Sequence, residues 1–321
     1  MSRSAKAHIL LLLITMVWGA TFVQIKAALS YSSPLMFNAV RMALAALALC
    51  IVFHKDLRRL TRGSLLAGSV VGFFLWLGYE FQTTGLELTT PSKSAFLTGL
   101  SVVLVPVFLA VFFRRHINRW TSMGAFTAFV GLFLLTVPGG ANGTGDFSSI
   151  NRGDILTIGC AVSFAFQIIF MGRSTQKYSF QQIAAVEAIV CALLMAITVP
   201  IVEQPYVVWN ATVILAILVT GLMGTAAAFT VQAWAQQFTP PTHTALIFSL
   251  EPVFAWITAV IVLGERIGWR SGFGGILILA GVLLSELKGS TPSATSEETG
   301  DAENGRPGDK REAVALSEFD R

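Results

Sequence analysis

Ten long apolar segments follow one another along the chain and constrain its fold more than any other feature. A helix that crosses a lipid bilayer needs about 20 mostly apolar residues. The first segment begins like a signal peptide, with Arg3 and Lys6 ahead of an apolar run, but the nine segments after it favour an uncleaved first span. The sequence therefore predicts an all-α integral membrane protein with ten transmembrane helices, at roughly 8–28, 34–53, 64–83, 92–113, 119–137, 153–171, 181–200, 212–234, 242–263 and 269–287.

The composition argues against a soluble protein. Hydrophobic residues make up 54% of the chain and charged residues 12%, whereas a soluble domain carries roughly 25% charged residues. The lysines and arginines lie mostly in short turns between apolar segments, so the net charge of +4 is not a sign of nucleic-acid binding. Cys50, Cys160 and Cys191 lie scattered within apolar segments and give neither a disulfide framework nor a zinc pattern. We expect no cofactor, no bound metal and no nucleic-acid partner.

The apolar segments contain an internal repeat. The stretches Thr89–Gly131 and Thr239–Gly281 each hold a helix led by proline, a charged turn and a helix with spaced glycines. A shift of 150 residues places Pro91, Ala95, Leu100, Ile117, Gly124 and Gly131 on Pro241, Ala245, Leu250, Ile267, Gly274 and Gly281. An internal repeat in a membrane chain points to a transporter. We expect two five-helix repeats, 1–140 and 141–288, and a polar, disordered tail, 289–321.

The distribution of lysine and arginine predicts the orientation, because cytoplasmic loops carry an excess of these bases. With a cytoplasmic N-terminus, twelve bases fall inside and five outside. The inside bases are Arg3, Lys6, Lys55, Arg58, Arg59, Arg62, Arg114, Arg115, Arg119, Arg173, Lys177 and Lys288, and the outside bases are Lys26, Lys93, Arg152, Arg266 and Arg270. Five helices per repeat is an odd number, so the second repeat enters the membrane upside down. We expect both termini in the cytoplasm.

Several motifs resemble the drug/metabolite transporter superfamily, and within it the EamA type. Residues 18–22, Trp-Gly-Ala-Thr-Phe, followed by Lys26, are similar to the opening of that family. The second segment is similar as well, with Ser33-Pro34 followed by Arg41 and Ala45. Residues 85–108 and 245–266 strongly resemble the two repeat hallmarks of the family.

The resemblance covers residues 8–287 and departs from the family at one motif. Arg114-Arg115-His116 stands where the family often has Gly-Glu-Arg, which the second repeat keeps at residues 264–266. The resemblance implies ten helices in two inverted repeats around a central substrate cavity, with the fifth and tenth helices at the periphery. It also implies export or exchange of small metabolites, amino acids or drugs.

Arg41 is the first candidate site residue. It is the eighth residue of the second segment, about 10 Å in from the outer end at a rise of 1.5 Å per residue. A charge inside a span is expensive and usually faces a cavity or a partner. In a functional role, Arg41 binds a carboxylate or phosphate of the substrate, or gates the outer vestibule. In a structural role, Arg41 pairs with Glu80 and holds two helices together. As a further alternative, the Arg41 side chain extends to the membrane surface and keeps its charge in water.

Three further ionisable residues lie inside spans. Glu251 lies near the middle of the ninth segment, directly before Pro252, which frees a backbone carbonyl near residue 248. Transporters build sites at such irregular backbone, although Glu251 also fits a structural cap of the same irregularity. Glu187 lies in the inner half of the seventh segment, and His243 opens the ninth. Buried carboxylates of this kind are compatible with proton coupling or with a purely structural role.

The remaining candidates are polar or aromatic. For each uncharged polar residue taken alone, a contact between helices is the more common role, and several of them facing one cavity would form a site. The uncharged candidates are Asn38, Gln82, Thr98, Gln167 and Gln232, with Trp18 and Tyr79 as an aromatic wall and Lys93 as a second base for an anionic substrate.

The function that these features predict is a secondary transporter of the cytoplasmic membrane, exporting a small metabolite, amino acid or drug by alternating access. A sugar-phosphate or nucleotide-sugar exchanger of the same superfamily is the alternative, and it would favour more bases in the cavity. A non-transporting membrane protein or an intramembrane enzyme fits less well, because the sequence lacks His-Glu-x-x-His, Gly-x-Ser-x-Gly and phosphate-loop motifs. The sequence is compatible with either a monomer or a homodimer.

The orientation can be tested by cysteine labelling. In a variant without the three native cysteines, single cysteines at Asn142 and Asn210 should react in intact cells with a maleimide that cannot cross the membrane. A cysteine at Arg59 should react only after the cells are opened, because the excess of bases holds that loop in the cytoplasm. Labelling of the Arg59 position in intact cells would overturn the predicted orientation.

Overall fold

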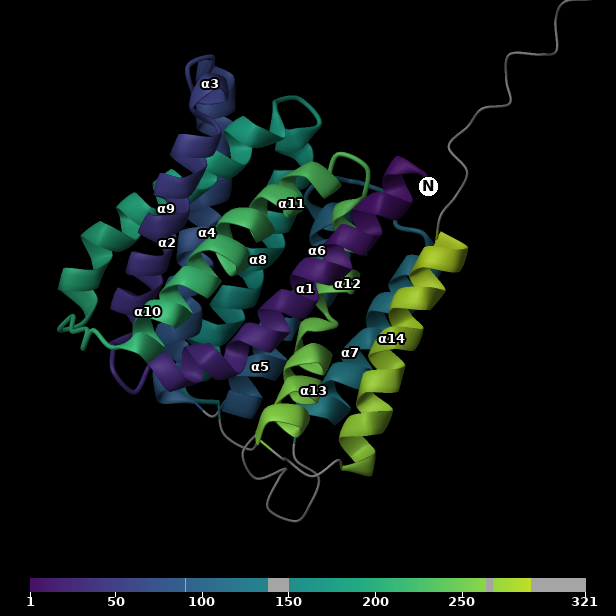
Figure 1. Cartoon of the computed structure of the whole chain (residues 1–321). Coiled ribbons are helices and arrows are strands. Elements are labelled where there is room, and N and C mark those ends of the chain that lie inside the picture. The colour runs from purple at the N-terminus through teal and green to yellow at the C-terminus, as the bar shows by residue number, and fades with distance from the viewer. Residues whose placement is uncertain (90, 138–149, 264–267, 290–321) are drawn as a thin grey trace, which may run out of the picture. The chain divides into compact units, whose positions relative to one another are not determined.

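The computed structural model describes residues 1–89, 91–137, 150–263 and 268–289, and its named elements in these ranges are all helices. The predicted disordered tail, most of the connection between the repeats and the turn at 264–267 lie outside the described residues. The elements, shown in Figure 1, are α1 (Arg3–Ala28), α2 (Pro34–Val52), α3 (His54–Leu57), α4 (Arg62–Leu88), α5 (Pro91–Gly99), α6 (Ser101–Val111), α7 (Arg119–Thr136), α8 (Arg152–Thr175), α9 (Phe180–Val202), α10 (Ala211–Leu218), the π-helix η2 (Val219–Ala227), α11 (Ala228–Ala235), α12 (Pro241–Phe248), α13 (Glu251–Leu263) and α14 (Trp269–Gly289).

Nine helical stretches among the described residues are long and apolar enough to cross a membrane. Three of them combine several elements: Ser94–Val111 from α5 and α6, Ala211–Ala235 from α10, η2 and α11, and Pro241–Val262 from α12 and α13. The fifth predicted segment, 119–137, forms the helix α7, which is not among the nine. The all-helical, multi-span fold is confirmed, and the tenth span stays a prediction.

The described helices expose large apolar side chains on their outer faces. Leu66, Ile201 and Ile261 are 68%, 77% and 75% exposed, and many other leucines, isoleucines and phenylalanines are more than half exposed. A soluble monomer rarely exposes a contiguous apolar patch of more than a few hundred Å². Such a surface is stable against lipid tails, because lipid tails are as apolar as leucine.

Two spans are interrupted at positions that are one repeat apart. Leu100 separates α5 from α6, and Ser249 and Leu250 separate α12 from α13. The backbone N–H of Leu100 donates to Leu97 O at 3.2 Å, and that of Leu250 donates to Ile247 O at 3.1 Å. Both bonds reach back three residues where an α-helix reaches back four. The irregularity expected near residue 248 is therefore present. The first interruption has Val102 at the position that matches Pro252, and its nearest following proline is Pro106 within α6.

Each half of the chain packs its first helix against the interrupted span of the other half. α1 lies against α12 and α13, and α8 lies against α5 and α6. α1 also packs on α11, and α8 packs on α4 and α9. The interruptions are thereby enclosed by protein, where neighbouring groups can satisfy the freed backbone atoms.

α7 and α14 form a closely packed antiparallel pair and run side by side in Figure 1. A Cβ atom added at Gly124 would lie 2.5 Å from the carbonyl oxygen of Gly281, and one at Gly131 would lie 2.6 Å from that of Gly274. Real Cβ atoms do not approach so closely, so glycine at these four positions is what lets the two backbones touch.

Alanine substitutions should test this approach. Gly131→Ala should destabilise the protein by about 1–3 kcal/mol, because the new methyl group meets backbone atoms that cannot rotate away. Gly272→Ala is the matched control on the same pair of helices, since nothing lies within 4 Å of its Cβ position. It should be neutral or slightly stabilising. Unfolding midpoints in detergent measure both, and equal stability of the two variants would contradict the close contact.

Candidate functional site

Trp18 lies where α1 meets the π-helix and the interrupted span α12–α13. Its indole Nε1 donates to the carbonyl oxygen of Gly224 in η2 at 2.6 Å. Its ring packs edge-on against Phe248, the last residue of α12, with ring centroids 4.9 Å apart. At the next residue, a Cβ on Gly19 would lie 2.9 Å from the carbonyl oxygen of Glu251, so α1 approaches the start of α13 closely. Trp18, predicted as a site residue, thus joins three elements.

The π-helix η2 is the element that sequence reasoning missed. Its nine residues, Val219–Ala227, interrupt a span that hydropathy marks as a single helix. Thr225 Oγ1 donates to Thr220 O at 2.9 Å, five residues back, which fits the wider π turn. A Cβ on Gly221 would lie 3.1 Å from the carbonyl oxygen of Arg41, so η2 lies directly against α2. π-Helical turns are frequent at functional sites, and the glycines at 221 and 224 are the only hint in the sequence.

Arg41 is buried in α2, with its guanidinium carbon 4.6 Å from the centre of the Tyr79 ring in α4. Tyr79 in turn packs edge-on against Phe164 of α8 at 5.7 Å. The Nε atom of Arg41 is buried without a hydrogen-bond partner among the described residues. A cation over an aromatic face recovers part of the cost of its desolvation. The unsatisfied donor leaves Arg41 able to bind an acceptor that the protein itself does not supply.

The pairing of Arg41 with Glu80, one of the predicted alternatives, is not formed in the described residues. Glu80 is buried at the interface between α4 and α9, where its Oε1 accepts a hydrogen bond from Thr198 Oγ1 at 2.7 Å. Glu80 follows Tyr79 directly in α4, and adjacent residues of a helix point about 100° apart. The matching depth of Arg41 and Glu80 was therefore misleading, because Tyr79 faces α2 and Glu80 faces α9.

A chain of buried amides leads from α11 to Glu187. Gln232 Nε2 donates to Gln167 Oε1 at 3.1 Å and to Gln236 Oε1 at 3.2 Å. Gln167 Nε2 donates to Glu187 Oε1 at 2.7 Å, and Gln236 Nε2 donates to the backbone oxygen of Ile168 at 2.9 Å. The predicted residues Gln167, Glu187 and Gln232 are thus brought into one network across α8, α9 and α11. Glu187 Oε2 has no hydrogen-bond partner among the described residues.

Glu251 is the first residue of α13, directly after the interruption of the span. It lies inside the bundle within electrostatic range of Arg41, yet it keeps part of its surface accessible. Tyr79 lies within electrostatic range of Arg41, Glu251 and Glu187. Tyr79 therefore has one cation and two carboxylates within electrostatic range, and of these Arg41 is in direct contact with its ring.

The other predicted residues fall outside this cluster or at its edge. Asn38 Nδ2 donates to Thr83 Oγ1 at 2.9 Å and ties α2 to α4. Thr98 contacts Cys160 across α5 and α8, with oxygen and sulfur 3.8 Å apart, and Gln82 is half-buried in α4. His243 lies at the end of the bundle, 3.0 Å from Glu286, and the side chain of Lys93 lies outside the described part of the chain. The central set is therefore Trp18, Arg41, Tyr79, Glu187 and Glu251.

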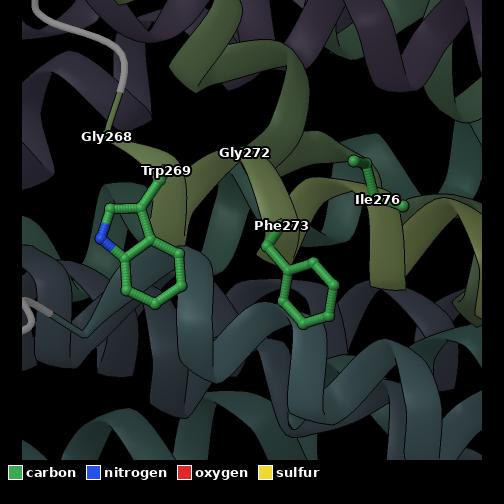
Figure 2. Close-up of a pocket in the computed structure, with 5 residues that line it drawn as sticks. All are labelled: Gly268, Trp269, Gly272, Phe273 and Ile276. Atoms are coloured by element: carbon green, nitrogen blue, oxygen red, sulfur yellow. The ribbon is translucent and has the colours of Figure 1, made fainter.

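A separate hollow of about 480 Å³ lies on one face of α14 (Figure 2). Its described lining is Gly268, directly before α14, and Trp269, Gly272, Phe273 and Ile276 in the first turns of that helix. The lining is apolar, and Trp269 is 84% exposed. Aromatic side chains at the end of a span commonly anchor it at the membrane surface, so this hollow fits a lipid contact better than a substrate site.

The sequence profile of the EamA-like transporter family matches the chain twice, at residues 5–137 and 151–287. The chain belongs to the EamA-like transporter family. The two matches together cover most of the sequence and divide it between α7 and α8. The resemblance of the opening motif and of the two repeat hallmarks to this family is confirmed.

Three relatives illustrate the similarity. An uncharacterized transporter of Archaeoglobus fulgidus is 32% identical over 278 residues, which cover 87% of this chain and 85% of the relative. The uncharacterized transporter YyaM of Bacillus subtilis is 28% identical, covering 86% of this chain and 92% of the relative. A probable amino-acid metabolite efflux pump of Salmonella typhimurium is 24% identical, covering 88% and 95%. The family and these relatives therefore indicate that the chain is a membrane transporter.

One solved crystal structure, of a protein given no more specific name, shares the fold. It superposes with a TM-score of 0.74 at 16% identity, and the match covers 88% of this chain and 97% of that one. At this identity the similarity concerns the fold alone. It covers nearly the whole of the other protein, so the helical arrangement is not peculiar to this EamA-like chain.

The separation of Arg41 from Glu80 should appear in a double-mutant cycle. Arg41→Met and Glu80→Gln should lower the unfolding free energy additively, within about 0.5 kcal/mol, because the two side chains share no partner. Thr198→Val with Glu80→Met is the positive control, because both substitutions remove this hydrogen bond, with an expected coupling of about 0.5–1.5 kcal/mol. A coupling between Arg41 and Glu80 larger than that of the control would restore the ion-pair hypothesis.

Proposed function

We propose that this EamA-like protein is a secondary transporter that exports small carboxylate-bearing metabolites, amino acids among them, across the cytoplasmic membrane by alternating access. The observation that carries the proposal is the Arg41 guanidinium, which is buried over the Tyr79 ring and has an unsatisfied Nε donor. A charge persists inside a membrane protein only where a partner or a ligand compensates its desolvation. A substrate carboxylate offers two acceptor oxygens to such a guanidinium.

The acidic residues around Arg41 fit the other end of an amino-acid substrate. Glu251 lies at the interruption between α12 and α13 and is partly accessible, and its backbone oxygen lies close to α1 at Gly19. A carboxylate there complements a substrate ammonium group, and it can also carry a coupling proton. Glu187, one oxygen of which is unpartnered in the described residues, is a second proton carrier of the same kind. The relative named as an amino-acid metabolite efflux pump supports this substrate class.

A sugar-phosphate or nucleotide-sugar exchanger is the second candidate. A phosphate carries up to two negative charges and is usually held by several bases. In the described part of the chain, the central set supplies Arg41 together with two glutamates. That balance of one base against two acids favours a zwitterion over a phosphate.

Two inverted repeats, 1–140 and 141–288, with both termini in the cytoplasm, are the architecture that we propose for the transport cycle. Three observations support it. The family profile matches each half once, the interruptions at Leu100 and Leu250 are one repeat apart, and the contact of Gly124 with Gly281 becomes that of Gly274 with Gly131 when the halves are exchanged. Because these helices run antiparallel, the operation that exchanges them turns one half over in the membrane.

Transport in proteoliposomes tests the substrate class. Counterflow of a radiolabelled amino-acid panel should be inhibited by amino acids but not by the corresponding amines, which lack the carboxylate, nor by sugar phosphates. Arg41→Gln should lower the rate about 10- to 100-fold, as expected for the loss of a charged hydrogen-bonding partner. Arg41→Lys should recover little of it, because a point charge does not reproduce the bidentate fork.

Arg173→Gln is the matched control, because Arg173 also lies over an aromatic ring, that of Phe113 at 4.5 Å, but at the end of α8. It should keep transport within about twofold, since the pair lies near the surface and contributes little. Full transport by Arg41→Gln would refute the assignment of Arg41. Inhibition by sugar phosphates in preference to amino acids would favour the exchanger.

A further inference from the structure

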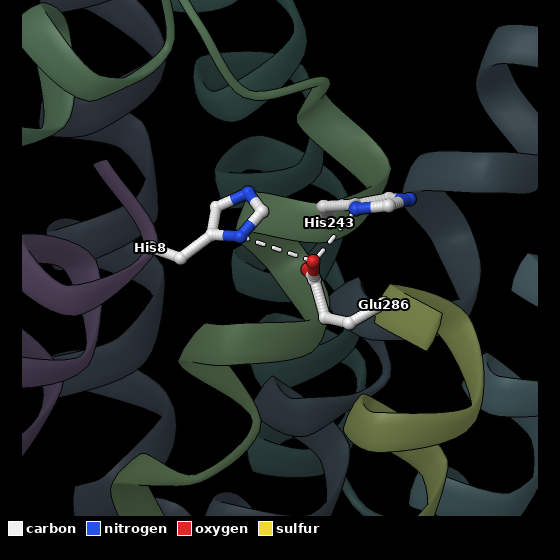
Figure 3. A group of neighbouring side chains, drawn as sticks. All are labelled: His8, His243 and Glu286. Atoms are coloured by element: carbon white, nitrogen blue, oxygen red, sulfur yellow. Dashed lines mark ion pairs between the residues drawn. The ribbon is translucent and has the colours of Figure 1, made fainter. Parts of the chain in front are cut away.

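Two histidines and one glutamate from three different helices meet at one end of the bundle (Figure 3). His8 of α1 places its Nδ1 atom 3.0 Å from Glu286 Oε2 of α14. His243 of α12 places its Nδ1 atom 3.0 Å from the other oxygen of the same carboxylate. One ligand atom from each of the three residues lies within 4.8 Å of the others. The two imidazole rings, whose centroids lie 6.2 Å apart, therefore both face one carboxylate.

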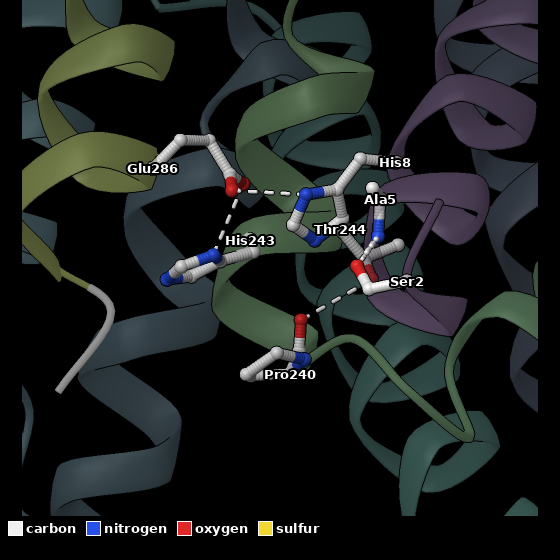
Figure 4. Close-up of polar contacts among 7 residues, drawn as sticks. All are labelled: Ser2, Ala5, His8, Pro240, His243, Thr244 and Glu286. Carbon is white, nitrogen blue, oxygen red and sulfur yellow. Dashed lines mark hydrogen bonds and ion pairs between the residues drawn. The ribbon is translucent and has the colours of Figure 1, made fainter. Parts of the chain in front are cut away.

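The cluster lies near helix ends that water can reach. His8 is the sixth residue of α1, His243 the third of α12, and Glu286 the fourth from the end of α14. The side chains of His8 and Glu286 are 26% and 19% exposed, and that of His243 is 8% exposed. Figure 4 shows the capped start of α1, where Ser2 accepts a hydrogen bond from Ala5, beside the cluster. The three residues are thus held by packed helices but open to solution on one side.

We propose that His8, His243 and Glu286 bind a divalent transition-metal ion of the Zn²⁺ class. Zinc takes imidazole nitrogen and carboxylate oxygen at about 2.0–2.2 Å, and its four ligands lie about 3.3 Å from one another. The two spacings of 3.0 Å, each to a different oxygen of the carboxylate, are close to that value. One ligand atom from each residue lies within 4.8 Å of the others, so the side chains have to draw together by side-chain rotation to share one ion. Three protein ligands with a solvent-facing fourth position form a common zinc geometry. Imidazole ligands favour zinc, copper and nickel over magnesium and calcium.

Metal binding at this place would lock helices that transport has to move. α1 carries Trp18 and α12 carries Phe248, whose rings pack at 4.9 Å next to the central site. α14 is held by its backbone contacts to α7. An ion shared by α1, α12 and α14 would fix the two central helices to this outer pair, so micromolar Zn²⁺ should inhibit transport. The site is thus regulatory, and its binding can be measured without transport.

Direct metal binding to the full, tag-free chain in detergent is the test. After treatment with EDTA, the protein should bind one Zn²⁺ per chain in isothermal titration, and Zn²⁺ should raise the unfolding midpoint by about 3 °C or more at saturation. Co²⁺ should give the visible absorption of a four-coordinate site. Mg²⁺ should neither bind at this stoichiometry nor raise the unfolding midpoint. Failure of the wild-type protein to bind one Zn²⁺ with micromolar or tighter affinity would overturn the proposal without any variant.

Substitutions identify the ligands. Glu286→Gln, and the double variant His8→Gln/His243→Gln, should each lower the Zn²⁺ affinity at least about 100-fold. The matched control is His54→Gln/His116→Gln, which removes the same number of imidazoles from positions elsewhere in the chain. It should bind Zn²⁺ like the wild type and stay inhibited by it. Unchanged affinity in Glu286→Gln, or equal loss in the control, would overturn the assignment of these three residues.

Discussion

Every backbone amide and carbonyl inside a bilayer needs a partner from the protein, because lipid offers none. The interruptions at Leu100 and Leu250 and the π-helix Val219–Ala227 all break the regular pattern within spans. Each of them lies where other helices cover it: α8 covers the first interruption, α1 the second, and α1 and α2 the π-helix. One face of each irregular stretch is thus covered by protein, and polar groups gather there. One such group is the Gly224 carbonyl, which accepts the indole N–H of Trp18.

Arg41 shows how the same constraint shapes the side chains. The protein places the Tyr79 ring against its guanidinium and brings the carboxylate of Glu251 within electrostatic range, but Nε stays without a partner in the described residues. A buried donor left unmade costs about 1–3 kcal/mol. Such a cost is understandable where a ligand completes the bonding during the transport cycle. The neighbouring amide chain from Gln236 to Glu187 is joined by four hydrogen bonds, yet Gln232 Oε1 and Glu187 Oε2 are also without a partner among the described residues.

Hydropathy and the repeat predicted the membrane helices well, because both depend on composition over about 20 residues. The spans of the structure fall on the predicted segments, and the interruption beside Glu251 falls where Pro252 indicated it. The partner of Arg41 was not predictable in this way. Depth along a helix follows from counting residues, but the face that a residue presents depends on how the helices rotate and pack. Glu80 has the right depth and points to Thr198. The π-helix was missed for a related reason, since its hydropathy equals that of an α-helix.

The features that the two halves of the chain share do not by themselves account for the candidate site. The backbone bonds of Leu100 and Leu250 match, and the glycine contacts of α7 and α14 map onto each other when the halves are exchanged. The side chains do not follow this symmetry. Ser101 stands one repeat before Glu251, and the helix α4 that carries Tyr79 corresponds to the span that contains η2. Both spans are interrupted, but of the positions 101 and 251 only the second, close to Trp18, carries a carboxylate. Under the proposed function, substrate selectivity therefore depends on the positions at which the two halves of the chain differ.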